Sequence, residues 1–199
     1  MRITFALLAS LVVLPSQAAA EPNQSTKYRY YAISGETPGD IYMAMVRRGP
    51  DVNGVNAYAS TLATTSQSGR LMLGKNCRID GYKVKIDFVI NLPRLSKETA
   101  IGGSTKAQWN RFKSFLKVHE ETHRSIWMSC ARNLESKIRT LSNPSCTALD
   151  SQANALFAKM RADCQKKHAA FDAAEQKRLL KHPFVKLVFG NRTKLARKN

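Results

Sequence analysis

The feature that most constrains the fold is a long run of apolar side chains at helical spacing, which also contains the sequence His119-Glu120-Glu121-Thr122-His123. We expect a helix from Ser104, a residue that can cap it, to about Leu141. Residues four apart project from one face of a helix, so His119 and His123 would lie side by side on the apolar stripe. Two such histidines with a glutamate between them form an HExxH motif, a pattern typical of zinc-dependent hydrolases.

The motif assigns a role to each of its ionisable side chains. His119 and His123 would bind Zn, and Glu120 would act as general base on the water that attacks the substrate. Alternatively, the two histidines would be core residues with satisfied hydrogen bonds. Burying two imidazoles and a carboxylate without a partner is costly, however, and a metal ion removes that cost. The motif therefore favours metal-assisted hydrolysis, most often of peptide bonds.

A second helical stripe follows a tight connection at residues 142–145 and runs from about Thr147 to Glu175. Two long helices joined by a short loop pack as an antiparallel hairpin. Upstream, the sequence predicts one short helix from Pro38 to about Arg48, because Thr37 can cap it and Pro38 suits the first helical position. Strands are predicted over residues 27–34, 55–65, 70–78 and 82–92. We therefore expect an α+β fold: a small antiparallel sheet with one short helix, followed by a long antiparallel helical hairpin that carries the HExxH motif.

The N-terminus has the composition of a targeting segment. Residues 1–20 combine a charged start, a short apolar run and an Ala-x-Ala end, which is typical of a secretory signal peptide. The apolar run is too short to span a bilayer. We expect an exported protein, periplasmic or secreted from a bacterium, with one metalloprotease-like α+β domain over residues 21–176 and a basic C-terminal tail over residues 177–199.

The formal net charge is +18, and residues 177–199 contain eight basic side chains and no acidic one. This segment is either a solvated tail or a surface that binds an anionic membrane or cell-wall polymer. Apolar residues between Leu179 and Phe189 interleave with its charges, as in a helix lying on a membrane, although Pro183 and Gly190 interrupt the pattern. Nucleic acid is the least favoured partner, because an exported chain without a nucleic-acid-binding motif offers only charge.

A catalytic zinc site needs a third protein ligand and keeps one position open. If the hairpin turns about the centre of its connection, His168 lies opposite His119. A register shifted by two turns places Glu175 there instead, and an intermediate register places Asp172 there. The third ligand is then His168, with Asp172 and Glu175 as alternatives, and the spacing does not choose between them. His182, the other histidine, is expected to be a surface residue of the basic tail.

An even number of cysteines in an exported chain indicates disulfides. Cys146 and Cys164 would lie about 27 Å apart along one helix, too far to bridge. Cys130 and Cys146 would be offset by roughly 16 Å along the hairpin. The remaining scheme joins Cys77 to Cys146 and Cys130 to Cys164, and the second bridge favours the register that brings Glu175 to His119.

Several short sequences together resemble a known family. They are residues 30–35 (Tyr-Tyr-Ala-Ile-Ser-Gly), Gly49-Pro50, Cys77, Leu92-Pro93, the HExxH run, Cys146 and Phe171-Asp172. From about Tyr28 to Glu175, the chain resembles a bacterial domain family of unknown function described as predicted secreted zinc-dependent proteases. The resemblance implies a zinc metallopeptidase of the cell envelope that acts on a peptide or protein substrate.

The chain departs from this family near the end of the second helix. Members commonly follow the aromatic-Asp pair with a Thr and then a His-Gly, whereas this chain has Glu175 and then Lys177-Arg178 at those positions. If that histidine is a ligand in the family, His168 or Glu175 would have to replace it here. The alternative function is therefore a degenerate, non-catalytic envelope-binding protein, whose basic tail associates with an anionic membrane or cell-wall polymer.

Overall fold

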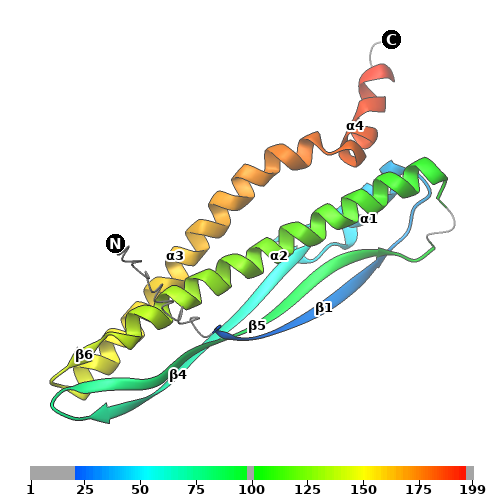
Figure 1. Cartoon of the computed structure of the whole chain (residues 1–199). Helices are drawn as coiled ribbons and strands as arrows, with labels where there is room; N and C mark the ends of the chain where they lie inside the picture. The colour runs from blue at the N-terminus through cyan, green and yellow to red at the C-terminus, as the bar shows by residue number, and fades with distance from the viewer. Residues whose placement is uncertain (1–20, 98–100, 196–199) are drawn as a thin grey trace, which may run out of the picture.

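The computed structural model describes residues 21–97 and 101–195, with side chains described up to residue 189. The described residues form four helices and a main sheet, arranged as an elongated molecule (Figure 1). In chain order the elements are β1 (Asn23–Ile33), α1 (Pro38–Arg48), β2 (Asp51–Val52), β3 (Val55–Asn56), β4 (Ser60–Leu73), β5 (Cys77–Leu95), α2 (Gly103–Arg139), β6 (Ser142–Asn143), α3 (Cys146–Lys181) and α4 (Pro183–Leu195).

Residues 1–20, where the sequence predicts a signal peptide, lie outside the described part of the chain. Among the helices that are described, none is long and apolar enough to cross a membrane. The mixed composition of helices and sheet agrees with the expected α+β class.

The main sheet is built around β5, which pairs with β4 on one side and with β1 on the other. β4 runs antiparallel to β5, whereas β1 runs parallel to it, with Tyr28 opposite Ile90. The sheet is therefore mixed, and the expectation of a purely antiparallel sheet is wrong. Alternating apolar residues report that one face of a strand is buried; they carry no information on the direction of its neighbour.

The strands are also longer than the sequence indicated. The expected strand 55–65 corresponds to the short β3 and the first part of β4, a continuous strand with an irregularity between Ser68 and Arg70. The expected strand 70–78 is wrong as a single strand, because these residues end β4, form the hairpin turn and begin β5. Gly69 lies at this irregularity, where a Cβ atom would come within 2.6 Å of the Ile79 side chain. The absence of a side chain there allows β4 to continue past Ile79 to the hairpin turn at residues 74–76.

β1 and β5 finish at the same end of the sheet, since Ile33 pairs with Leu95. β4 begins near that end, on the other side of β5. The chain between β1 and β4 must therefore pass across the end of β5. α1 fills this connection over the range that the sequence predicts. Thr37 caps its N-terminus in a capping box with Asp40, and Pro38 takes the first helical position.

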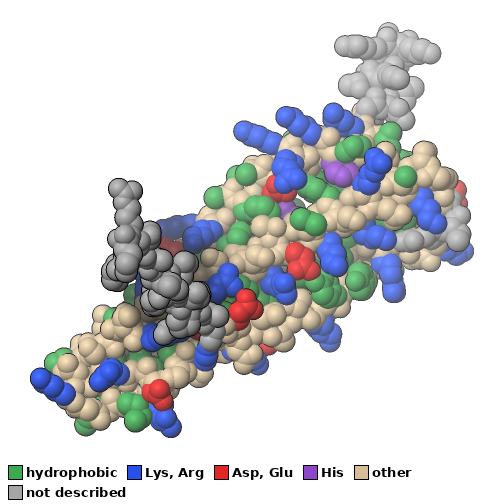
Figure 2. Space-filling view, in the orientation of Figure 1, with side chains coloured by type: hydrophobic (Ala, Val, Ile, Leu, Met, Phe, Trp, Pro, Cys, Tyr) green, Lys and Arg blue, Asp and Glu red, His purple; other side chains and the backbone are tan. Residues whose placement is uncertain are grey.

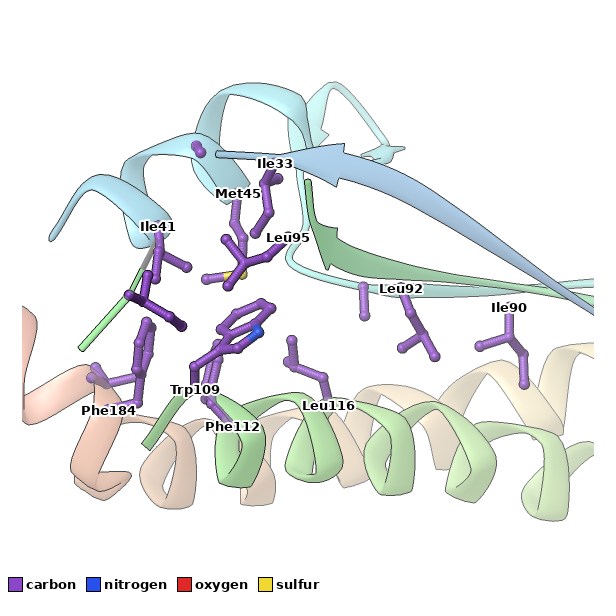
Figure 3. Packing of buried hydrophobic residues seen from close by; sticks show 14 residues of the cluster. Ile33, Ile41, Met45, Ile90, Leu92, Leu95, Trp109, Phe112, Leu116 and Phe184 are labelled. Atoms are coloured by element: carbon purple, nitrogen blue, oxygen red, sulfur yellow. The ribbon is translucent and has the colours of Figure 1, made fainter. Parts of the chain in front are cut away.

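α2 packs against β5, and α3 runs back along α2 (Figure 1). Every second residue of the strand stretch Val84–Leu92 is buried, as its alternation predicts. At one end of α2, Trp109 and Phe112 are fully buried against Ile41 and Met45 of α1 (Figure 3). The N-cap of α2 is Gly102 and makes no side-chain capping bond, so the expected Ser104 cap is wrong.

The basic C-terminal segment is partly built into this core. α3 continues to Lys181, so the boundary that we expected after Gln176 falls within a helix. Phe184 and Val185 of α4 are buried, and the Phe184 ring stacks on Phe112 at 4.9 Å. His182, which we expected at the surface, is partly buried beside Phe112 and Phe115. Its Nδ1 accepts a hydrogen bond from the Phe184 backbone N–H.

Candidate metal centre

The HExxH motif lies near the middle of α2, on the side that faces α3. The Nε2 atoms of His119 and His123 are 3.1 Å apart. From α3, Asp172 Oδ1 lies 3.3 Å from His119 Nε2 and 3.0 Å from His123 Nε2. One ligand atom from each of the three residues falls within 4.8 Å of the others, so two imidazoles and one carboxylate converge on a single point.

This donor set fits a zinc ion. Ligand atoms bound tetrahedrally at about 2.0–2.1 Å lie roughly 3.3 Å from one another. The three separations between His119, His123 and Asp172 are close to that value. Two imidazole nitrogens and a carboxylate oxygen are also the ligand types that leave one position of a catalytic zinc open.

The second nitrogen of each imidazole also has a neighbour on α3. His123 Nδ1 lies 2.8 Å from His168 Nδ1. His119 Nδ1 lies 4.0 Å from a carboxylate oxygen of Glu175, within ion-pair range but beyond a hydrogen bond. Outer partners of this kind orient metal-binding histidines and select their tautomer. Of the three residues that the sequence offered as third ligand, the structure therefore groups Asp172 with the two histidines and places His168 and Glu175 behind them.

Aromatic side chains hold the two imidazoles in place. Phe171 stacks on the His119 ring at 4.8 Å and meets the His123 ring edge-on at 5.2 Å. Trp127 lies 5.3 Å from the His168 ring. Because these contacts exclude water, burial lowers the pKa of His119, His123 and His168, although the nearby Asp172 carboxylate opposes the shift. The neutral imidazole is the form that binds a metal.

Glu120 contacts β4 and is 4% exposed. Thr61 of β4 donates its hydroxyl hydrogen to Glu120 Oε2 at 2.8 Å. Burial raises the pKa of Glu120 to about 7, with a smaller contribution from the charge of Asp172, while the Thr61 hydrogen bond acts in the opposite direction. A carboxylate with a pKa near neutrality can both accept and return a proton under ordinary conditions.

A cleft opens at this centre between β4 and α3. One part has a volume of about 560 Å³ and is lined by residues 60–63 of β4 and by Gln165 and His168 of α3. The adjoining part, about 620 Å³, is lined by Tyr58, Phe115 and Leu179. His119, Glu120 and Asp172 border both parts. A bound chain could therefore extend to either side of the three residues.

The register between the two helices differs from the one that the loop centre predicts. His168 contacts His123 rather than His119, a shift of one helical turn. The connection is not a symmetric turn, because β6 pairs with β5 before α3 begins, with Asn143 opposite Cys77. Loop length alone cannot anticipate this pairing.

Both predicted disulfides are present. Cys130 joins α2 to Cys164 of α3 with a Cα–Cα distance of 6.2 Å, and Cys77 joins the start of β5 to Cys146 at the start of α3, at 5.2 Å. The first lies about two helical turns beyond His123 and thus holds α2 and α3 together near the site. Paired cysteines are typical of an oxidising, exported environment.

Sequence reasoning missed Thr61. Alternation does not identify the inner face of β4, because Leu62 is 55% exposed while Thr61 faces α2, and it does not indicate that Thr61 meets Glu120. That contact depends on how α2 crosses the sheet, which no local pattern encodes.

Residues 28–179 match a family model described as a bacterial protein of unknown function (DUF922). The match covers most of the chain, from β1 to the last turns of α3. The chain belongs to the DUF922 family. No curated protein and no solved structure matches it. The DUF922 match spans every residue of the site: Thr61, His119, Glu120, His123, His168, Asp172 and Glu175.

The chain differs from the family pattern near the end of α3. Lys177, which stands where the resemblance implies a histidine, is exposed. Asp172 and Glu175 instead face His119 from the preceding turns of the helix. In this DUF922 member, a set of three potential ligands therefore forms without a histidine at position 177.

Proposed function

We propose that the protein is an exported zinc-dependent hydrolase, in which His119, His123 and Asp172 hold the metal and Glu120 is the general base. The observation that carries this proposal is the convergence of three ligand atoms within 4.8 Å at the floor of a cleft, beside a buried glutamate. Burial opposes the charge of Glu120 and of the two imidazoles, whereas the Asp172 side chain is 53% exposed. Bringing such groups together out of water is costly unless they have a chemical role.

Zinc held at this point would polarise the carbonyl of the bond to be cleaved. Glu120 would take a proton from the attacking water and return it to the leaving amine. Because Thr61 donates to Oε2, the free oxygen Oε1 is the one expected to carry the proton. His168 and Glu175 would position the imidazoles through their Nδ1 atoms.

The walls of the cleft favour a peptide substrate. In the described part of the chain, β4 pairs only with β5, so its other edge retains backbone groups that can pair with an added strand. Residues 60–63 of this edge line the cleft beside Glu120. An extended peptide would bind there by strand addition. Tyr58, Phe115 and Leu179 would then receive an apolar side chain on one side of the scissile bond.

The decisive experiment measures metal content and hydrolysis on the same preparations of the mature, disulfide-bonded protein, purified without chelator. We expect stoichiometric zinc in the natural protein and in Glu120→Gln, and loss of zinc in Asp172→Ala. Hydrolysis of a mixed peptide pool should fall by about 10²–10⁴-fold in Glu120→Gln, since that is the usual contribution of a general base.

Protein that contains no stoichiometric metal would refute the proposal. Stoichiometric zinc without any hydrolysis would instead support the degenerate, non-catalytic envelope protein. Retention of zinc in Asp172→Ala, with its loss in His168→Ala, would return the third ligand to His168.

A further inference from the structure

The end of the molecule farthest from α4 carries exposed apolar side chains. There the β4–β5 hairpin ends beside the connection between α2 and α3, with β6 paired to β5 at Cys77 and Arg78 (Figure 1). Leu71, Met72 and Leu73, which we call the apolar tip, are 41%, 47% and 78% exposed. Consecutive strand residues point to opposite faces, so both faces of the hairpin are apolar at its end. A wedge of this shape suits insertion into a soft apolar layer better than contact with a flat protein face.

The apolar tip is held rigidly. The disulfide Cys77–Cys146 ties the start of β5 to α3, four residues after Leu73 in the chain. β6 adds backbone pairing at Cys77 and Arg78. The exposure of the tip is therefore built into a braced hairpin and does not result from fraying at a strand end.

Basic side chains surround the apolar tip. Residues 70–83 contain four basic side chains and one acid, Asp80, which is already paired with Arg70 at 2.8 Å. A cavity of about 680 Å³ opens between the hairpin and the end of α2. Its lining includes Met72, Tyr82, Arg78, Lys83, Arg139, Asp80 and Glu135. Figure 2 shows Lys and Arg side chains beside apolar ones at this end of the molecule.

Glu135, the second acid of this cavity, is buried at 3% exposure. One of its oxygens accepts the Val84 backbone N–H, and the other lies 3.7 Å from Lys83 Nζ, so Lys83 neutralises it. The accessible rim is therefore mainly cationic. An apolar wedge with a cationic rim matches the cross-section of an anionic bilayer, in which acyl chains lie beneath phosphate headgroups.

We propose that the apolar tip inserts into an anionic lipid membrane, with Arg78 and Arg139 contacting the headgroup phosphates. This surface is distinct from the C-terminal segment that the sequence favoured for membrane binding, which has Phe184 and Val185 buried in the core. The proposal is independent of hydrolysis. At about 3.3 Å per residue, β4 separates Leu73 from Thr61 by roughly 40 Å, so the cleft would face substrates well above the membrane.

The test is co-sedimentation of the mature protein with vesicles made of two parts phosphatidylcholine and one part phosphatidylglycerol. The tip variant is Leu71→Ser with Met72→Ser and Leu73→Ser. The matched control is Leu180→Ser with Leu187→Ser and Phe189→Ser, which removes the exposed apolar residues at the C-terminal end. We expect the natural protein and the control variant to bind, and the tip variant to bind at least about 10-fold more weakly, because it loses three large apolar contacts.

Binding should also weaken in high salt and be lost with vesicles of phosphatidylcholine alone. A Leu73→Trp variant supplies a second readout, since its fluorescence should shift to shorter wavelength when vesicles are added. The proposal is overturned if the natural protein does not bind the mixed vesicles, if only the C-terminal variant loses binding, or if neutral vesicles bind equally well. Circular dichroism of each variant establishes that the fold is retained.

Discussion

Two regions of the molecule are each joined to α3 by a disulfide, and they differ in which kinds of side chain they bury and expose. At the candidate metal centre, held by Cys130–Cys164, Glu120, His168 and Glu175 are buried and aromatic rings pack against the imidazoles. At the apolar tip, held by Cys77–Cys146, large apolar residues are exposed to solvent. Neither arrangement favours folding. Burying an ionisable group costs free energy, and leaving an apolar side chain exposed gives up the stabilisation that its burial would provide.

The two disulfides have one property in common. Each braces a region whose residues run against the rule that apolar groups lie inside and charged groups outside. Such exceptions persist when the surrounding structure supports them, and they mark places where function rather than stability selects the residues. We therefore expect that changes at the two regions separate stability, metal binding and membrane binding from one another.

The largest effect on stability should come from removing either disulfide. Its loss releases loop entropy in the unfolded chain, worth about 4 kcal/mol for the 34-residue separation of Cys130 and Cys164, and slightly more for the 69-residue separation of Cys77 and Cys146. Urea denaturation of the two double-alanine variants measures this cost.

Zinc titration of the same two variants separates the regions. Removing Cys130–Cys164 should also weaken zinc binding, because that bridge sets the register of α2 against α3. Removing Cys77–Cys146 should leave zinc affinity unchanged and weaken vesicle binding by the apolar tip. Equal loss of zinc affinity in both variants would contradict the division between the regions.

The next effect is the cost of burying Glu120. Its pKa of about 7 in the folded protein lies above the ordinary 4.5, so folding favours the protonated form. This penalty is absent below pH 4.5, grows as the pH rises and is complete above pH 7. In metal-free protein, Glu120→Gln should therefore gain stability over the natural protein by up to about 3 kcal/mol between pH 4.5 and 8.

Thermal or urea unfolding of both proteins across this pH range measures the difference. Leu73→Ser at the apolar tip is the control, and its stability relative to the natural protein should not change with pH. If the gain of Glu120→Gln is the same at pH 4.5 and pH 8, the raised pKa assigned to Glu120 is wrong.

The smallest effect should come from His168. As an outer partner of His123, it should support zinc affinity by about 10–100-fold, so His168→Ala retains the metal but binds it more weakly. Competition with a zinc indicator measures the affinity. Lys167→Ala, an exposed neighbour on the same helix, is the matched control and should bind zinc as the natural protein does.

Local patterns predicted much of the fold. The capping signals of Thr37 and Pro38 placed α1 correctly, and the 3.6-residue period placed the HExxH motif on a long helix followed by a second one. Distances along a helix selected the two disulfides correctly. These inferences succeeded because each depends on residues close in sequence or on the known rise of a helix.

Non-local features were harder to predict. The parallel pairing of β1 with β5 was missed because alternation is the same in parallel and antiparallel neighbours. The basic C-terminal segment was expected to be a separate tail, yet Phe184 packs on Phe112 in the core. The basic side chains of this segment indicated only that part of it faces solvent. Its apolar residue Phe184 contacts Phe112, which lies more than seventy positions earlier in the chain.

The sequence by itself determined that His119, Glu120 and His123 share neighbouring turns of one helix, and it limited the third ligand to His168, Asp172 or Glu175. Only the tertiary structure decided that Asp172 joins the two histidines, that His168 lies behind His123, and that Thr61 meets Glu120. Helical periodicity is encoded in adjacent residues, whereas the register of α3 on α2 and the crossing of α2 over β4 are set by the packing of the whole chain.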